Sequence, residues 1–235
     1  PWDISIPLAN GLNWNPRFVF QSYSAYSPEL DEANARHYRS EEGPAFILYS
    51  HKAIDGQHPL TTDPLTWLEL FRWYAIQDDY VGLAPIYYKD QLGEMVLLRR
   101  RQTPRCGEPQ LLGERQLSLG ERWEVPSLSG DLILLQAQFK LRTLGAWRDW
   151  CFKNYAPEIF VEYQNGAKKK FRLVWRNAAS GFLVSDLPLE LPQVRSLWEK
   201  GEGSPVTAIT FIANEKHFKN MVAIRWLKLP LLAGQ

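Results

Sequence analysis

Two histidines and an aspartate in the loop HKAIDGQH, residues 51–58, are the side chains best suited to chemistry. Imidazoles beside a carboxylate can serve acid–base catalysis or bind a cation, which makes His51, Asp55 and His58 candidate site residues. The loop follows an apolar run, and ligands of open α/β sheets favour the carboxyl ends of strands. The same letters also suit a polar turn, in which Asp55 accepts bonds from backbone amides and Gly56 adopts a positive φ. Both interpretations stay open at this stage.

Two further groups of side chains suit ligand binding. Gln21, Ser22, Tyr23 and Tyr26 supply an amide, hydroxyls and aromatic rings just before a predicted helix, where a sugar or a phosphate can bind. Their alternative role is to pack the rings and cap the helix. Trp147 and Trp150 stand three residues apart in GAWRDW, a spacing that suits either a stacking platform for a sugar or a plug at one end of a β structure.

Several functional classes have no support in the sequence. The chain contains no Gly-x-Ser-x-Gly elbow, no P-loop, no Gly-x-Gly-x-x-Gly and no His-Glu-x-x-His, and this lowers the expectation of an autonomous enzyme. Cys106 and Cys151 lack the spacing of metal ligands, so we expect free thiols, no metal and no cofactor. The net charge of +1 argues against binding to nucleic acid.

The N-terminal third predicts a small α/β unit. Residues 18–20 have strand-forming types, and Ser27-Pro28 followed by acidic residues starts a helix that ends near Gly43. The apolar run AFILYS, residues 45–50, then reads as a buried parallel strand, which predicts a right-handed βαβ unit. A second helix is expected from Asp63 to about Tyr74. Strands are expected at residues 81–89 and 94–101.

The rest of the chain has a β pattern. Residues 103–130 are rich in Gly and Pro and predict a connector with the first short strands. Strands are expected at 131–143, 157–164, 168–176, 180–186, 205–213 and 221–229, with a short helix at 192–199. The predicted fold class is therefore α+β, with a βαβ-containing α/β domain at 1–102 and an antiparallel β-sandwich at 131–235. The first 102 residues have 9 Lys and Arg against 13 Asp and Glu and the remainder 18 against 13, which suits two units with different surfaces.

The hairpin EIFVEYQNGAKKKFRLVW permits a prediction of register. A two-residue turn at Asn165-Gly166 leaves both faces of the hairpin mixed, whereas a three-residue loop gathers the apolar side chains on one face and sets Glu162 across from Lys168. We therefore predict the three-residue loop, with Gly166 in the left-handed region. The lysines at 168–170 then form a solvated tip, or alternatively contact a phosphate or an anionic lipid.

The stretches NGLNWNPRFVFQSYSAYSPELDEANARHY and RLVWRNAASGFLVS resemble the C-terminal soluble segment of uncharacterised bacterial multi-pass membrane proteins. Those proteins are loosely similar to glycosyltransferases that use lipid-linked sugars. They have Arg-Pro-Val-Phe where this chain has Arg17-Phe18-Val19-Phe20, and the resemblance carries over no catalytic residue. It implies that Pro1 follows a transmembrane region of the same chain and that this piece lies on the extracytoplasmic side of the membrane.

Three functions follow as hypotheses. The first is an accessory domain without catalysis that binds a glycan or a lipid-linked sugar in an aromatic-lined groove between the two halves. The second is a structural or protein-interaction module, in which the Trp rings are buried. The third is an enzyme that uses the loop at 51–58 and holds Asp55 within hydrogen-bond reach of a histidine.

Overall fold

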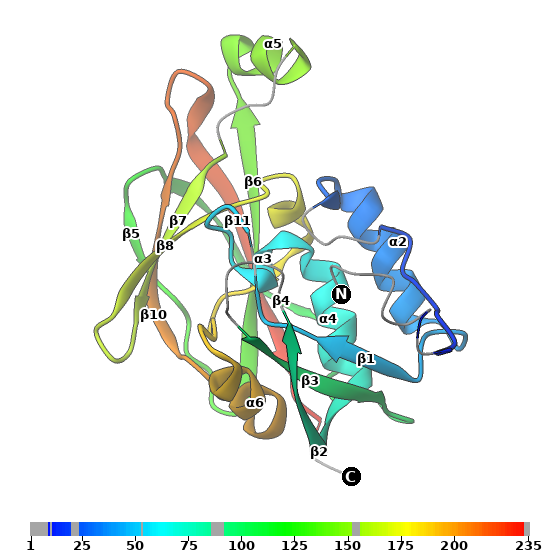
Figure 1. Cartoon of the computed structure of the whole chain (residues 1–235). Coiled ribbons are helices and arrows are strands. Elements are labelled where there is room, and N and C mark those ends of the chain that lie inside the picture. The colour runs from blue at the N-terminus through cyan, green and yellow to red at the C-terminus, as the bar shows by residue number, and fades with distance from the viewer. Residues whose placement is uncertain are drawn as a thin grey trace.

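The computed structural model describes residues 9, 11–19, 24–52, 54–85, 92–151 and 156–232. In chain order the elements are α2 (Pro28–Arg39), β1 (Phe46–Tyr49), α3 (Pro59–Thr62), α4 (Pro64–Trp73), β2 (Tyr74–Pro85), β3 (Leu92–Arg100), β4 (Gln110–Ser118), β5 (Arg122–Glu124), β6 (Asp131–Leu141), α5 (Thr143–Cys151), β7 (Glu158–Tyr163), β8 (Lys168–Arg172), the 3₁₀ turn η2 (Asn177–Ser180), β9 (Phe182–Leu183), α6 (Leu191–Lys200), β10 (Val206–Ile212) and β11 (Phe218–Pro230). The mixture of helices with antiparallel sheets confirms the predicted α+β class (Figure 1). Within the described part of the chain, no helix combines the length and the apolar character needed to cross a bilayer.

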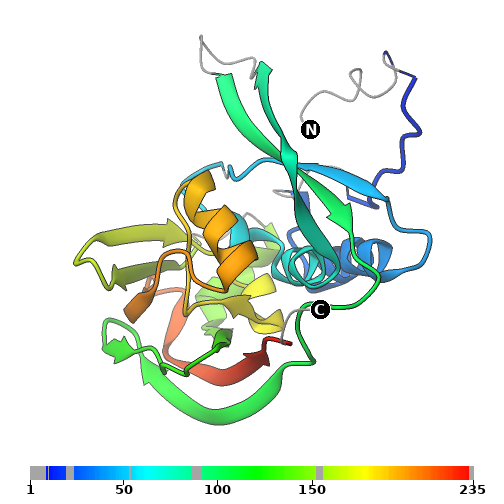
Figure 2. The same cartoon turned by 90° about the horizontal axis from the view of Figure 1, so that it is seen from below.

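Helices α2 and α4 lie side by side, as both views show (Figures 1 and 2). The predicted start of α2 is confirmed, since the Ser27 hydroxyl accepts a bond from the Leu30 amide and Pro28 occupies the first turn. Asp31 of α2 is fully buried and accepts bonds from the backbone amides of Leu65 and Thr66, at 2.9 Å each. One carboxylate thus satisfies the free N–H groups at the start of α4 and fixes the two helices to each other.

The predicted βαβ unit is wrong. Strand β1 pairs antiparallel with β3, and β3 lies between β1 and β2 in a three-stranded sheet. The apolar run at 45–50 suggested burial on both faces, but β1 is an edge strand whose Phe46 side chain is 53% exposed. Strands β2 and β3 form a long twisted ribbon that stands out of the body of the molecule (Figure 2).

The strand predicted at 18–20 is not formed at Phe18 and Val19, and residue 20 lies outside the described residues. The cause is a side chain on α2. The Asn34 amide accepts a bond from the Val19 N–H at 2.7 Å and donates to the Val19 carbonyl at 3.3 Å. Because one buried amide satisfies both backbone groups of Val19, this residue needs no neighbouring strand.

The second half of the chain forms two four-stranded antiparallel sheets, in the orders β5-β10-β7-β8 and β4-β11-β6-β9. Side chains from both sheets belong to one hydrophobic core. Within this core, the Phe139 ring of β6 meets the Phe211 ring of β10 edge to face, with centroids 5.4 Å apart. The other face of the β4-β11-β6-β9 sheet is partly covered by α4, and this is where the candidate groove lies.

The hairpin between β7 and β8 has the predicted register. Glu162 pairs with Lys168, and Gly166 has a φ of +81°. The Tyr163 amide donates to the Ala167 carbonyl, which closes a three-residue loop. Burial of Val161 and its apolar neighbours on one face selects this register over the two-residue alternative.

Buried polar side chains join the helical part to the two sheets. The Asn177 side-chain amide of η2 donates to the carbonyls of Ala25 and Thr62, at 2.6 and 2.8 Å. The Trp198 indole of α6 donates to the Tyr74 carbonyl at 3.2 Å. The hydrophobic core also runs without a break from α2 to β11. The predicted domain limits at 102 and 131 stay a prediction.

Candidate binding groove

The predicted loop at 51–58 brings its two histidines together around one oxygen atom. Nε2 of His51 and Nε2 of His58 lie 2.7 and 2.9 Å from the carbonyl oxygen of Pro188. A carbonyl can only accept, so each Nε2 carries the hydrogen. The Nδ1 atoms then accept bonds, in His51 from the Tyr49 hydroxyl and in His58 from the Leu60 amide.

This arrangement makes both histidines neutral structural residues. Burial lowers the pKa of His51 to about 4 and that of His58 to about 3. Asp55 is exposed, and no hydrogen bond among the described residues joins its carboxylate to either imidazole. Gly56 adopts the expected positive φ of 69°. The positive φ of Gly56 agrees with the polar-turn interpretation, whereas no hydrogen bond among the described residues joins the Asp55 carboxylate to a backbone amide. The acid–base hypothesis is left without a catalytic pair among the described residues.

The other predicted binding residues have separate outcomes. Gln21, Ser22 and Tyr23 fall outside the described residues, while Tyr26 is 40% exposed. Trp147 and Trp150 are on α5, with 59% and 84% of their surfaces exposed, so they do not plug the end of a sheet. Among the described residues, the exposed Trp147 and Trp150 on α5 are thus not part of one site with the buried histidines of the loop at 51–58.

A groove of about 500 Å³ lies between the α2–α4 pair and the β4-β11-β6 face. Its lining comprises Arg39, Leu65, Leu68, Glu69, Arg72, Glu108, Pro109, Leu111, Glu114, Leu134, Gln136, Ser180, Arg225 and Leu227. The walls of this groove are formed by polar and aliphatic side chains, and its described lining does not include the aromatic rings that the first hypothesis predicted. A smaller extension of about 300 Å³ continues along the sheet past Gln116 and Gln138.

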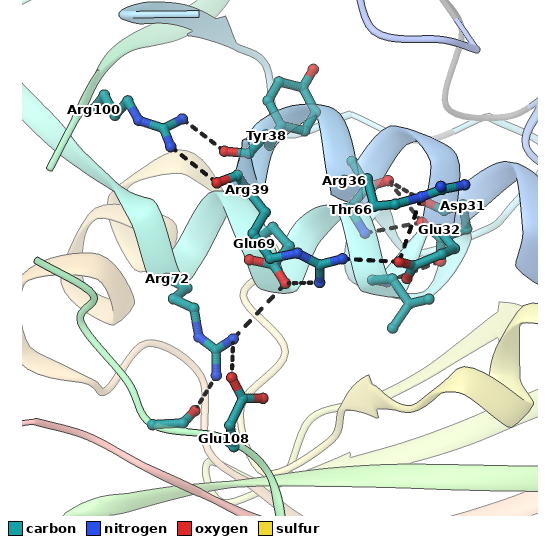
Figure 3. Close-up of polar contacts among 12 residues, drawn as sticks. Asp31, Glu32, Arg36, Tyr38, Arg39, Thr66, Glu69, Arg72, Arg100 and Glu108 are labelled. Carbon is teal, nitrogen blue, oxygen red and sulfur yellow. Dashed lines mark hydrogen bonds and ion pairs between the residues drawn. The ribbon is translucent and has the colours of Figure 1, made fainter. Parts of the chain in front are cut away.

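The helical wall of the groove carries a chain of ion pairs (Figure 3). Arg39 lies 3.0 Å from Glu32 and 3.0 Å from Glu69, and Arg72 lies 2.9 Å from Glu108. Glu69 also faces Arg72 across 3.9 Å. The side chains of Glu69 and Arg72 are only 6% exposed, so the centre of the chain is held away from water while its ends reach it.

The surroundings hold these charges in place. Burial raises the pKa of Glu69, and the neighbouring guanidinium groups of Arg72 and Arg39 oppose that rise. The Arg72 guanidinium also donates to the Gly107 carbonyl at 2.6 Å. At the end of α2, Arg100 donates to the carbonyls of Tyr38 and Arg39 (Figure 3). A cation on those free carbonyls stabilises the last helical turn, which carries Arg39 to the groove.

The floor of the groove is an ordered polar surface on three strands. The strand register sets Arg225 of β11 between Glu114 of β4 and Gln136 of β6, and Arg225 lies 2.8 Å from Glu114. In the next row, Ala223 lies between Gln116 and Gln138. Alternation along a strand places the residues of both rows on the same face. Because the Ala223 side chain is small, the floor of the groove is deeper at the centre of the second row.

The set of donors and acceptors suits a ligand rich in hydroxyl groups. Guanidinium groups donate, carboxylates accept, and each glutamine amide does both. Each groove arginine already has a carboxylate partner, so the walls carry no large excess charge that would favour a phosphate. Among the described residues, no cluster of three or more His, Cys, Asp or Glu side chains has the arrangement of a metal site.

The sequence contained one signal for this site that was not used. In LILLQAQFK, Gln136 and Gln138 interrupt an apolar strand at alternate positions, which indicates one polar patch on an otherwise buried face. The partners of this patch come from β4 and β11, about 20 and 90 residues away. Local pattern does not reveal such pairings.

Comparisons of the chain with protein-family models, with curated proteins and with solved structures found no match. A function must therefore be argued from the geometry of the groove and from the surface around it.

Proposed function

We propose that this chain is a binding module without catalysis and that its groove receives a neutral glycan, either free or linked to a lipid. The observation that carries the proposal is the charge-compensated groove of about 500 Å³ with Arg225 and Gln136 on its floor. Its volume is in the range of small-ligand sites. The resemblance of the sequence to segments of bacterial membrane proteins supports an accessory role on the extracytoplasmic face of such a protein.

The fixed polar groups of the groove support a sugar ligand. A sugar offers pairs of neighbouring hydroxyl groups that both donate and accept hydrogen bonds. The planar fork of Arg225 and the amides of Gln136 and Gln138 can meet such pairs. The Leu65 and Leu68 side chains of α4, with Leu134 of β6, supply an apolar strip for the C–H face of a sugar ring.

The test is a thermal-shift screen with neutral oligosaccharides, followed by calorimetry on the best ligand. A parallel arm uses the same sugars on a lipid carrier in detergent, which distinguishes the two sources. We expect Arg225→Gln to weaken binding about tenfold, because the fork of charge-assisted hydrogen bonds is lost.

Arg122→Gln is the matched control. Arg122 is 49% exposed and pairs with Glu162 on β7, whereas Arg225 is 52% exposed and pairs with Glu114. Arg122→Gln also removes a longer contact with Glu124, at 3.8 Å, but all of these ion pairs are on the surface, so we expect similar small losses of stability. Equal affinities of the two variants, or no ligand in either arm of the screen, would contradict the proposal.

A further inference from the structure

Helix α5 lies at one extreme of the molecule (Figure 1), and one of its faces is apolar and exposed. Leu144, Trp147 and Trp150 lie at intervals of three residues and are 51%, 59% and 84% exposed. Isolated exposed apolar residues are ordinary on protein surfaces, but two indoles and a leucine on one short helix form a patch. Residues of α5 do not contribute to the described lining of the groove, so the patch is a separate surface.

The position of α5 is set by close packing on the turn between β10 and β11. A Cβ atom at Gly145 would lie 2.1 Å from the carbonyl oxygen of His217, so only glycine permits this contact. The Arg142 amide donates to the same carbonyl, and its side chain donates to the Phe218 carbonyl. Because these contacts hold the opposite side of the helix, the Trp face is directed away from the body of the protein.

Exposed basic side chains lie close to α5 at this end of the molecule. Lys140 and Arg142 are exposed just before α5, Lys216 is exposed in the turn on which the helix rests, and Lys219 is exposed at the start of β11. Glu215 is an acid in that turn. Asp149 of α5 is paired with Arg176, so its charge is compensated. The end of the molecule that carries the indoles is therefore electropositive.

We propose that α5 and the β10–β11 turn bind the surface of an anionic phospholipid bilayer. Indole rings favour the boundary between headgroups and acyl chains, because they have an apolar body and a polar N–H group. Lysines beside an apolar helix face add attraction to anionic headgroups. A protein partner would also account for the indoles, but the exposed lysines on both chain segments that adjoin α5 favour an anionic bilayer.

The test is co-sedimentation of the chain with vesicles of phosphatidylcholine alone and of an equal mixture of phosphatidylcholine and phosphatidylglycerol. We expect binding to the mixed vesicles to be about tenfold stronger than to the neutral ones, and added salt to weaken it. The double substitution Trp147→Ser and Trp150→Ser should reduce binding to the mixed vesicles by about tenfold or more.

Two further variants keep the test decisive. Phe46→Ser removes an exposed aromatic ring from β1 and should bind vesicles as the unchanged chain does. Lys216→Glu with Lys219→Glu leaves the indoles intact and should abolish the preference for phosphatidylglycerol. Failure of the unchanged chain to sediment with mixed vesicles would overturn the proposal. So would equal binding to both vesicle types, or full binding by a folded double Trp variant. None of these results bears on the sugar groove.

Discussion

The imidazoles of His51 and His58 share the carbonyl oxygen of Pro188, which joins the loop after β1 to the segment before α6. Each ring donates from Nε2 and accepts at Nδ1, so each needs to remain neutral for its bonds to persist. A residue type that suggests catalysis in the sequence thus serves as a buried connector in the fold. The same bonds make the folded state sensitive to acid.

A pH prediction follows for His58. Its pKa is about 3 in the folded state, below the usual value of 6.5. Its contribution to stability is therefore complete above about pH 6.5 and is lost as the pH falls toward the folded value. When the pH is lowered from about 7 to about 5, the free energy of unfolding of the unchanged chain should fall by about 2 kcal/mol more than that of a His58→Gln variant.

The comparison must be made between the two proteins, because buried aspartates act in the opposite direction. Burial raises the pKa of Asp63 to about 7 and that of Asp186 to about 6. Their unfavourable ionisation removes stability as the pH rises through those values. Urea unfolding of both proteins at the two pH values checks the prediction. A stability difference that is the same at both pH values would contradict it.

At the scale of elements, local signals in the sequence predicted local structures well. The Ser27-Pro28 start of α2 and the three-residue loop of the β7–β8 hairpin depend on neighbouring residues, and both have the predicted form. The parallel pairing of β1 was wrong because pairing depends on distant residues. The order β1-β3-β2 is set by the hairpin between β2 and β3, which an apolar run at 45–50 cannot reveal.

The hairpin gives a prediction about one turn. Gly166→Ala should lower the free energy of unfolding by about 1 kcal/mol, because φ is +81° and a Cβ is disfavoured there. Gly113→Ala on β4 is the control, since Gly113 does not have a positive φ and a Cβ would meet open space. Urea unfolding of both variants checks this. Equal free energies of unfolding of the two variants would contradict a left-handed backbone conformation at Gly166.

At the scale of the whole molecule, one hydrophobic core unites α2, α3, α4 and α6 with the three-stranded sheet and the two four-stranded sheets. The groove exists only because α4 rests on the outer face of the β4-β11-β6 sheet. Its polar residues come from helices and strands distant in the sequence, so pattern analysis located single residues and not the site. The sequence left two interpretations of Trp147 and Trp150 open because their exposure depends on where α5 packs.

The junction between these parts is tested by Asn177. Asn177→Ala leaves the carbonyls of Ala25 and Thr62 buried without this donor, and should cost about 2 kcal/mol. Asn165→Ala, at an exposed turn position with one local bond, should cost less than half as much. We expect urea unfolding to remain a single transition that shifts as a whole. Two transitions, with only one displaced, would contradict a common core.

The most direct measurement of the central claim is an NMR titration of the chain with the oligosaccharide found by the thermal-shift screen. The side-chain signals that shift identify the residues that contact the oligosaccharide, whatever its affinity. We predict that the amide groups of Gln136 and Gln138 and the guanidinium group of Arg225 shift on binding, while the indole signals of Trp147 and Trp150 stay in place. Shifts confined to the two indoles, with the groove signals unchanged, would contradict the assignment of the groove as the binding site.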